Sequence, residues 1–150
     1  MKKLLAIACL AVAISVSMAF TSPLIEVLKV KLAVNAPEKA KPNEEFTVEL
    51  TINKEGESGF CKLEHMIPLG FIATEIETQN QGAVFIFEKQ TVKFIWLQVP
   101  ANNQVKVKYK IKVDPSVKPD KYKMEGRFSY TENKKIKRVD APKWDITIEK

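Results

Sequence analysis

The sequence predicts an all-β protein that folds as an antiparallel sandwich, and three observations lead to this class. The first is the run VKVKYKIKV at 105–113, where apolar residues alternate with Lys106, Lys108, Lys110 and Lys112. Successive side chains of a strand point to opposite faces, so this run predicts a strand with one buried and one solvated face. The second observation is that the same period recurs along most of the chain. The third is that turn signals separate these segments about every dozen residues.

The first strand is expected at 25–34, where apolar residues are interspersed with charge. The stretch 36–45 is rich in proline and charge, so we expect a surface loop there. The segment 45–53 alternates without a break and predicts the second strand. A third strand at 60–67 should stop at Pro68, because proline cannot donate a hydrogen bond to a neighbouring strand.

The remaining strands follow the same logic, and no segment shows a run at helical period. The chain around residues 79–82, Gln-Asn-Gln-Gly, is expected to form a turn between two of these strands. Besides the strand at 105–113, they are expected at 71–78, 83–87, 92–99, 122–130 and 144–149, with a short strand around Ile136 in a charged hairpin.

Residues 1–19 have the pattern of a cleavable signal peptide: Lys2 and Lys3, an apolar run at 4–16, and small residues at the cleavage point. An uncleaved anchor is the alternative, but the apolar run is shorter than the roughly 20 residues that span a bilayer. We therefore expect residues 20–150 to be exported as one sandwich domain. Its location would be periplasmic, cell-surface or extracellular, with no integral membrane segment, and its formal net charge would fall from +6 to +4.

Cleavage would leave Cys61 as the only cysteine, because the other one, Cys9, lies in the leader. One cysteine cannot form an internal disulfide, so the fold must depend on its hydrophobic core. Cys61, Leu63 and His65 share one face of the predicted third strand. We expect Cys61 to be a small buried hydrophobic residue there.

No catalytic constellation accompanies these strands, so we expect a protein that is not an enzyme and that carries no cofactor. His65 is the only histidine. Its nearest nucleophile in sequence, Cys61, would lie on the same face but roughly 13 Å away along the strand. Asp114 and Asp120 bracket a loop that could hold calcium, but neighbouring lysines argue against it. No metal site is expected.

Two features are candidates for partner binding. The lysine ladder (Lys106, Lys108, Lys110 and Lys112) could form one positive face for an acidic protein, an anionic glycan or lipopolysaccharide. Six further basic residues would join it: Lys121, Lys123, Lys134, Lys135, Lys137 and Arg138. Alternatively, the lysines keep a sheet edge soluble and block strand addition.

The second candidate is the strand that carries Phe85 and Phe87, which is apolar on both faces, as is the segment 94–97. Such strands either lie under a second layer of structure or leave a surface for a partner. The sequence leaves both possibilities open.

Three motifs occur in a recognisable order: Pro-Leu-Gly-Phe at 68–71, VKFIW at 92–96, and the alternating strand 105–113. This layout, over roughly residues 45–113, resembles the extracellular immunoglobulin-like repeat modules known as DUF11-like or conserved-repeat domains. The chain departs from that family at Ile67, where leucine is usual, and it lacks the upstream aspartate. The resemblance implies an immunoglobulin-like β-sandwich in an envelope or surface setting, and it brings no catalytic residue.

The sequence therefore predicts an exported, non-catalytic binding or assembly module of the bacterial cell envelope. It would contact an envelope or surface protein through a sheet face or edge. A carbohydrate-binding module is the alternative, and it would need a row of exposed aromatic side chains. Nucleic acid is not expected as a partner, because exported proteins rarely meet it and few aromatic residues interleave with the lysines.

Overall fold

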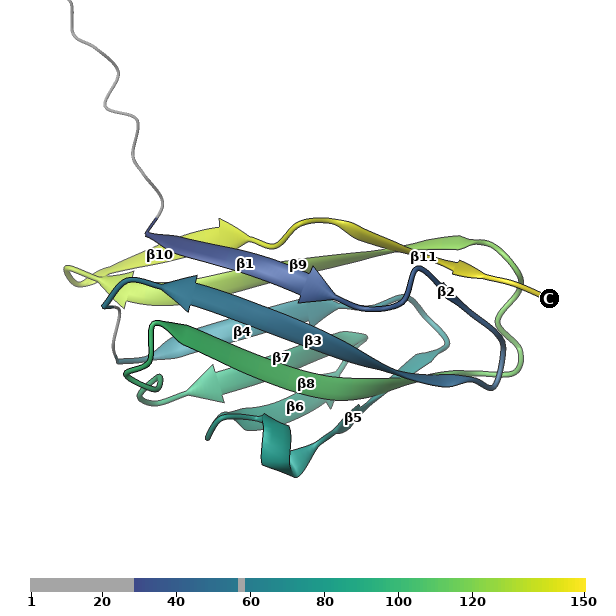
Figure 1. Cartoon of the computed structure of the whole chain (residues 1–150), viewed down its shortest axis with the longest axis horizontal. Helices are drawn as coiled ribbons and strands as arrows, with labels where there is room; N and C mark the ends of the chain where they lie inside the picture. Colours follow the sequence, from purple (N-terminus) through teal and green to yellow (C-terminus); the bar gives the residue numbers. More distant parts are fainter. Residues whose placement is uncertain (1–28, 57–58) are drawn as a thin grey trace, which may run out of the picture.

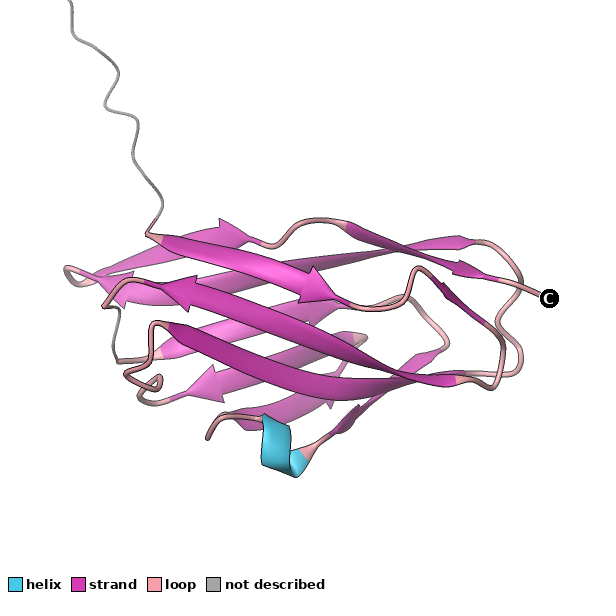
Figure 2. Ribbon diagram, viewed as in Figure 1, coloured by secondary structure: helices cyan, strands magenta, loops and turns pink. Residues whose placement is uncertain are grey.

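The computed structural model describes residues 29–56 and 59–150, and they form two packed β-sheets. The predicted signal peptide, 1–19, lies outside the described residues. Figure 1 shows the two layers, with β1, β3 and β8 crossing in front of β4, β7 and β6. In these described residues strands make up nearly all of the regular structure, and the short 3-10 helix η1 (Glu77–Gln79) lies at one side of the sandwich (Figure 2).

The smaller sheet has four antiparallel strands in the spatial order β1-β3-β8-β5. The two central strands, β3 and β8, alternate buried apolar and outward polar residues, as a strand with one buried face requires. The lysine ladder lies on β8, which pairs with β3 on one side and β5 on the other. The strands are β1 (Val30–Asn35), β3 (Glu45–Lys54), β5 (Phe71–Glu75) and β8 (Gln104–Val113).

The larger sheet has the order β2-β11-β9-β4-β7-β6, and β10 pairs with β9 beside β11. All its pairings are antiparallel except β2 with β11. Its strands are β2 (Lys39–Ala40), β4 (Cys61–Met66), β6 (Val84–Glu88), β7 (Thr91–Trp96), β9 (Lys121–Glu132), β10 (Lys135–Asp140) and β11 (Trp144–Ile148).

The core lies between the inner faces of the two sheets. The alternating apolar residues of β8 and of β7 are fully or almost fully buried, among them Tyr109, Phe94 and Trp96. Cys61 is also completely buried, which confirms the prediction of a small core residue. The central strands therefore bury their apolar positions as the two-residue period predicted.

Two parts of the chain differ from the sequence prediction. The expected loop at 36–45 contains the two-residue strand β2, which pairs with β11 more than 100 residues later in the chain. The expected strand 71–78 ends at Glu75, and η1 follows it. Strands β5 and β6 do not pair across a turn, because β5 belongs to the smaller sheet and β6 to the larger one.

The connections between paired neighbours are tight. Lys89 and Gln90 join β6 to β7, and Asn133 and Lys134 join β9 to β10, all with positive φ. Two successive residues with φ > 0 match the twist of a two-residue β-hairpin. The Gln90 side chain also donates hydrogen bonds to the carbonyl oxygens of Pro68 and Phe71, at 2.6 and 3.0 Å. It thereby ties this hairpin to the chain that crosses between the sheets.

Candidate protein-interaction surface

Within the part of the chain that the structure describes, the buried side-chain pair that could suggest chemistry is His65 with Tyr109. His65 Nδ1 and the Tyr109 hydroxyl are hydrogen-bonded across the core, from β4 to β8. Burial lowers the pKa of His65 to about 4, and burial raises the pKa of Tyr109 well above its usual value. Both groups are therefore neutral at pH 7, and neither is open to solvent. Their geometry is that of a core hydrogen bond joining the two sheets.

No cluster of three or more His, Cys, Asp or Glu residues within 29–56 and 59–150 is placed to hold a metal ion. Over the same residues, none of the helical structure is long and apolar enough to cross a membrane.

The lysine ladder lies on the outer face of the smaller sheet and faces solvent. Its charge is partly balanced by two glutamates of β3. Glu49 lies 3.0 Å from Lys108 and 3.7 Å from Lys106, and Glu45 lies 2.8 Å from Lys110. The neighbouring lysines lower the pKa of Glu49. Such exposed pairs contribute about 0–1 kcal/mol each, so their main effect is to reduce the positive potential of this face.

Two expectations about the lysines are wrong. The ladder does not protect a sheet edge, because β8 is an interior strand between β3 and β5. It does not join the basic residues of 121–138 in one positive face either. Those basic residues lie on β9, on β10 and in the turn between them, which belong to the larger sheet, whereas β8 belongs to the smaller one.

Phe85 and Phe87 lie on the inner side of β6, where they are partly buried and pack against the core. The register places them opposite Phe94 and Val92 of β7. A role for these two side chains in partner binding stays a prediction. On the outward face of the same strand, Val84 is the well-exposed apolar side chain, at 59%.

A shallow groove of about 500 Å³ lies on the outer face of the larger sheet. It crosses β4, β9 and β10, whose outward side chains form its floor and walls because strand residues alternate between faces. We call it the β4–β9–β10 groove. Its lining residues are Phe60, Lys62, Glu64, Arg127, Ser129, Tyr130, Thr131, Ile136 and Arg138.

Apolar side chains lie exposed in this groove. Phe60, directly before β4, is 49% exposed, and Ile136 of β10 is 66% exposed. Ile136 is paired in register with Thr131 of β9. Large exposed apolar side chains scattered singly are ordinary, but two that line one concave surface mark a candidate contact site.

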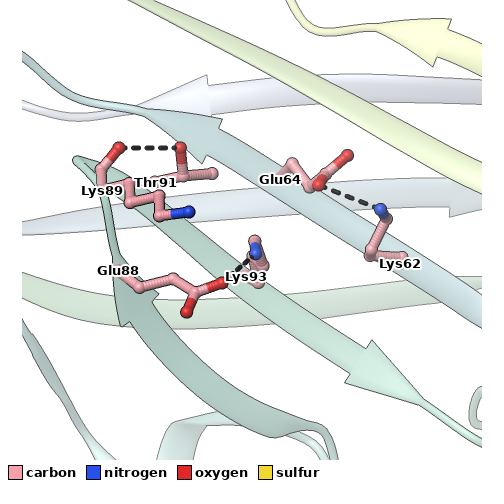
Figure 3. A network of polar contacts seen from close by, with 6 residues as sticks. All are labelled: Lys62, Glu64, Glu88, Lys89, Thr91 and Lys93. Carbon is pink, nitrogen blue, oxygen red and sulfur yellow. Dashed lines mark hydrogen bonds and ion pairs between the residues drawn. The ribbon is translucent and has the colours of Figure 1, made fainter.

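Charged side chains surround the apolar residues. Lys62 lies 2.9 Å from Glu64, and Arg127 lies 2.9 Å from Asp140. Figure 3 shows Lys62 with Glu64 on β4, beside the pair Lys93 and Glu88 on the neighbouring strands. An apolar centre with arginine nearby and a polar surround is typical of protein–protein interfaces.

The sequence analysis missed this groove, since it brings the β9–β10 hairpin together with β4, which lies more than 50 residues earlier in the chain. One signal was available: Ile136 lies outside the apolar alternation of its strand, amid charged residues. Phe60 gave no such signal, because it directly precedes a buried strand.

The two sheets, their antiparallel pairing and the core between them define an immunoglobulin-like β-sandwich. No model of a known protein family matches the sequence, and no curated protein sequence matches it.

Solved structures do match the fold. A non-cellulosomal cohesin from the hyperthermophilic archaeon Archaeoglobus fulgidus is similar with a TM-score of 0.60 and 13% identity, over 81% of this chain and 92% of its own. A collagen-binding domain from a Staphylococcus aureus adhesin has a TM-score of 0.45 and 14% identity, over 79% of this chain and 97% of its own. At these identities the likeness shows the fold alone.

Proposed function

We propose that this protein is an exported, non-catalytic binding module of the bacterial cell envelope, and that it contacts a protein partner through the β4–β9–β10 groove. The observation that carries the proposal is the exposure of Phe60 and Ile136 in one concave surface. Burying such side chains against a partner gains about 25 cal/mol per Å² of apolar area. The likeness to the archaeal cohesin contributes the fold to this proposal and nothing about the partner.

The lysine ladder is the weaker surface for a partner. Glu45 and Glu49 already balance part of its charge, and interior lysines of a solvated sheet face need no partner. A carbohydrate-binding role has less support. Phe60 is the one aromatic side chain of the described residues that is about half exposed, whereas Trp96 is 1% exposed and Trp144 packs edge-on against Phe46. A sugar-binding row of aromatic rings is therefore missing from the part of the chain that the structure describes.

Site-specific photo-crosslinking in the native cell tests the surface. With p-benzoyl-phenylalanine in place of Phe60 or of Ile136, we expect the same single protein adduct, identified by mass spectrometry. The matched control carries the probe in place of Thr47, on the outer face of the smaller sheet, and should give no adduct. An adduct from Thr47 alone would assign the contact to the lysine-ladder face, and no protein adduct from any position would refute the proposal.

We also propose that the protein is exported, on the pattern of residues 1–19. We propose further that it is a DUF11-like repeat module, on the motifs at 68–71 and 92–96 and the alternating strand 105–113. We expect the mature protein to begin at Phe20, with a mass lower by that of residues 1–19. Cell fractionation, followed by N-terminal sequencing of the purified protein, measures both the location and the cleavage point. A protein recovered uncleaved in the cytosol would contradict export, and it would leave the groove as a site for a cytosolic partner.

A further inference from the structure

The β4–β9–β10 groove carries more positive than negative charge. Three cationic side chains line it, Lys62, Arg127 and Arg138, against one carboxylate, Glu64. Lys62 and Arg127 are engaged with Glu64 and Asp140. Arg138 forms no ion pair with any of the described residues, and it is exposed to solvent. The groove thus offers one guanidinium whose hydrogen-bonding capacity is open to a ligand.

The free guanidinium lies next to the apolar part of the groove. Arg138 and Ile136 are two residues apart on β10 and point to the same outer face, which separates their backbones by roughly 7 Å. Ser129 and Thr131 are their register partners on β9. A single short ligand can therefore reach both the apolar side chain and the cation.

We propose that the groove binds an extended segment of a partner protein in which a large apolar side chain stands beside a carboxylate. This inference deepens the proposed function and rests on it. The apolar side chain packs between Phe60 and Ile136, and the carboxylate accepts hydrogen bonds from Arg138. Arginine suits this role because its planar guanidinium can donate two parallel hydrogen bonds to one carboxylate. A volume of about 500 Å³ fits a few side chains of such a segment.

The charges of the two faces favour this occupant over a polyanion. An anionic glycan would be attracted by charge spread over a wide surface, as on the lysine ladder, and would gain nothing from Phe60. In the groove, two of the cations already have carboxylate partners, so a single added carboxylate satisfies the remaining one. The apolar contact then supplies the selectivity for a protein segment.

Binding of the full exported chain to an array of eight-residue peptides tests the inference. The peptides vary one central position (Leu, Phe or Ala) and its two neighbours (Asp, Asn or Lys), and hits are titrated by fluorescence polarisation. We expect Asp-flanked Leu or Phe peptides to bind best. Replacing the central residue by Ala, or the Asp residues by Asn, should each weaken binding about tenfold, as for a side chain contributing about 1.4 kcal/mol.

Surface variants assign the two halves of the site. Phe60→Ala should abolish the dependence on the central residue, and Arg138→Ala should abolish the preference for Asp over Asn. Arg138→Glu should reverse that preference and select Lys-flanked peptides, a gain that misfolding cannot produce. Lys108→Ala, on the opposite face, is the matched control and should leave every titration unchanged.

Three results would overturn the inference. One is that no peptide binds, another is that binding does not depend on the central residue, and the third is that heparin binds through Arg138 equally well in Phe60→Ala. The last would assign the groove to an anionic glycan. The photo-crosslinking experiment distinguishes this inference from the proposed function. An adduct at Phe60 without peptide binding would refute this partner chemistry and leave the protein-binding role in place.

Discussion

Replacing Gly70 with alanine should lower the free energy of unfolding by about 2–5 kcal/mol. Gly70 has a φ of +86°, in the region that L-residues avoid, which costs about 1–2 kcal/mol for a residue with a Cβ. A Cβ at this position would also lie 2.5 Å from Cγ2 of Val117. Val117 is buried and β-branched, so it has little freedom to move away, and such overpacking costs about 1–3 kcal/mol.

Gly82→Ala is the matched control for this prediction. Gly82 has a similar φ of +76°, but no heavy atom lies within 4 Å of the position that its Cβ would take. The Gly82→Ala variant should therefore lose about 1–2 kcal/mol of unfolding free energy, from the backbone conformation alone. Urea unfolding followed by tryptophan fluorescence measures both variants. In addition, Val117→Ala should cost less in the Gly70→Ala background than in the wild type, because it removes the clash. Equal losses in the two glycine variants would show that the Val117 contact does not matter.

The strands could be predicted from the sequence because their signal is local. Alternation in 45–53 and 105–113 comes directly from the two-residue period, and the break at Pro68 needs only the chemistry of proline. The pairing of strands could not be predicted in the same way. β5 and β6 are neighbours in sequence but lie in different sheets, and β2 pairs with a strand near the opposite end of the chain.

For the candidate site, too, local properties could be predicted from the sequence, and properties that depend on strand pairing could not. The outward direction of the ladder lysines is a local property, and it was predicted correctly. Their place in the middle of a sheet depends on the partners of β8, and it was not. The groove needs the register of β4 with β9 and of β9 with β10 before Phe60 and Ile136 come together. No periodicity within a single strand contains that information.

The stability of the protein should fall as the pH is lowered from about 7 to about 4, and His65 should be the main cause over most of that range. His65 is 1% exposed, and burial lowers its pKa to about 4 in the folded protein, against an ordinary value of 6.5. Between these two values the unfolded chain binds a proton at His65 that the folded chain does not. Acid therefore favours unfolding in this window, and the contribution of His65 is complete above pH 6.5 and is lost progressively down to pH 4.

The expected loss is about 2–3 kcal/mol between pH 7.5 and pH 4.5, since each unit of pKa difference corresponds to about 1.4 kcal/mol. Protonation of surface carboxylates also lowers the free energy of unfolding in acid. The ion pairs of Glu88 and Glu149 with nearby lysines, for example, lower the pKa of each carboxyl. Their contribution is lost as the pH falls through their folded pKa values, below the ordinary value of 4.5. The His65 effect therefore stands alone at pH 5–6.5.

His65→Gln isolates the effect, because glutamine stays neutral at every pH and can still hydrogen-bond to the Tyr109 hydroxyl. Urea unfolding of both proteins at half-unit steps from pH 7.5 to 4.5 should show the wild type losing stability below pH 6.5, while the variant stays nearly constant down to pH 5. Tyr109→Phe separates the hydrogen bond from the titration. It should destabilise the protein by about 1–3 kcal/mol at pH 7, because it leaves a buried His65 nitrogen without its partner, yet keep the loss in acid. Parallel curves for the wild type and His65→Gln between pH 6.5 and 5 would show that His65 charges as readily in the folded core as in the unfolded chain.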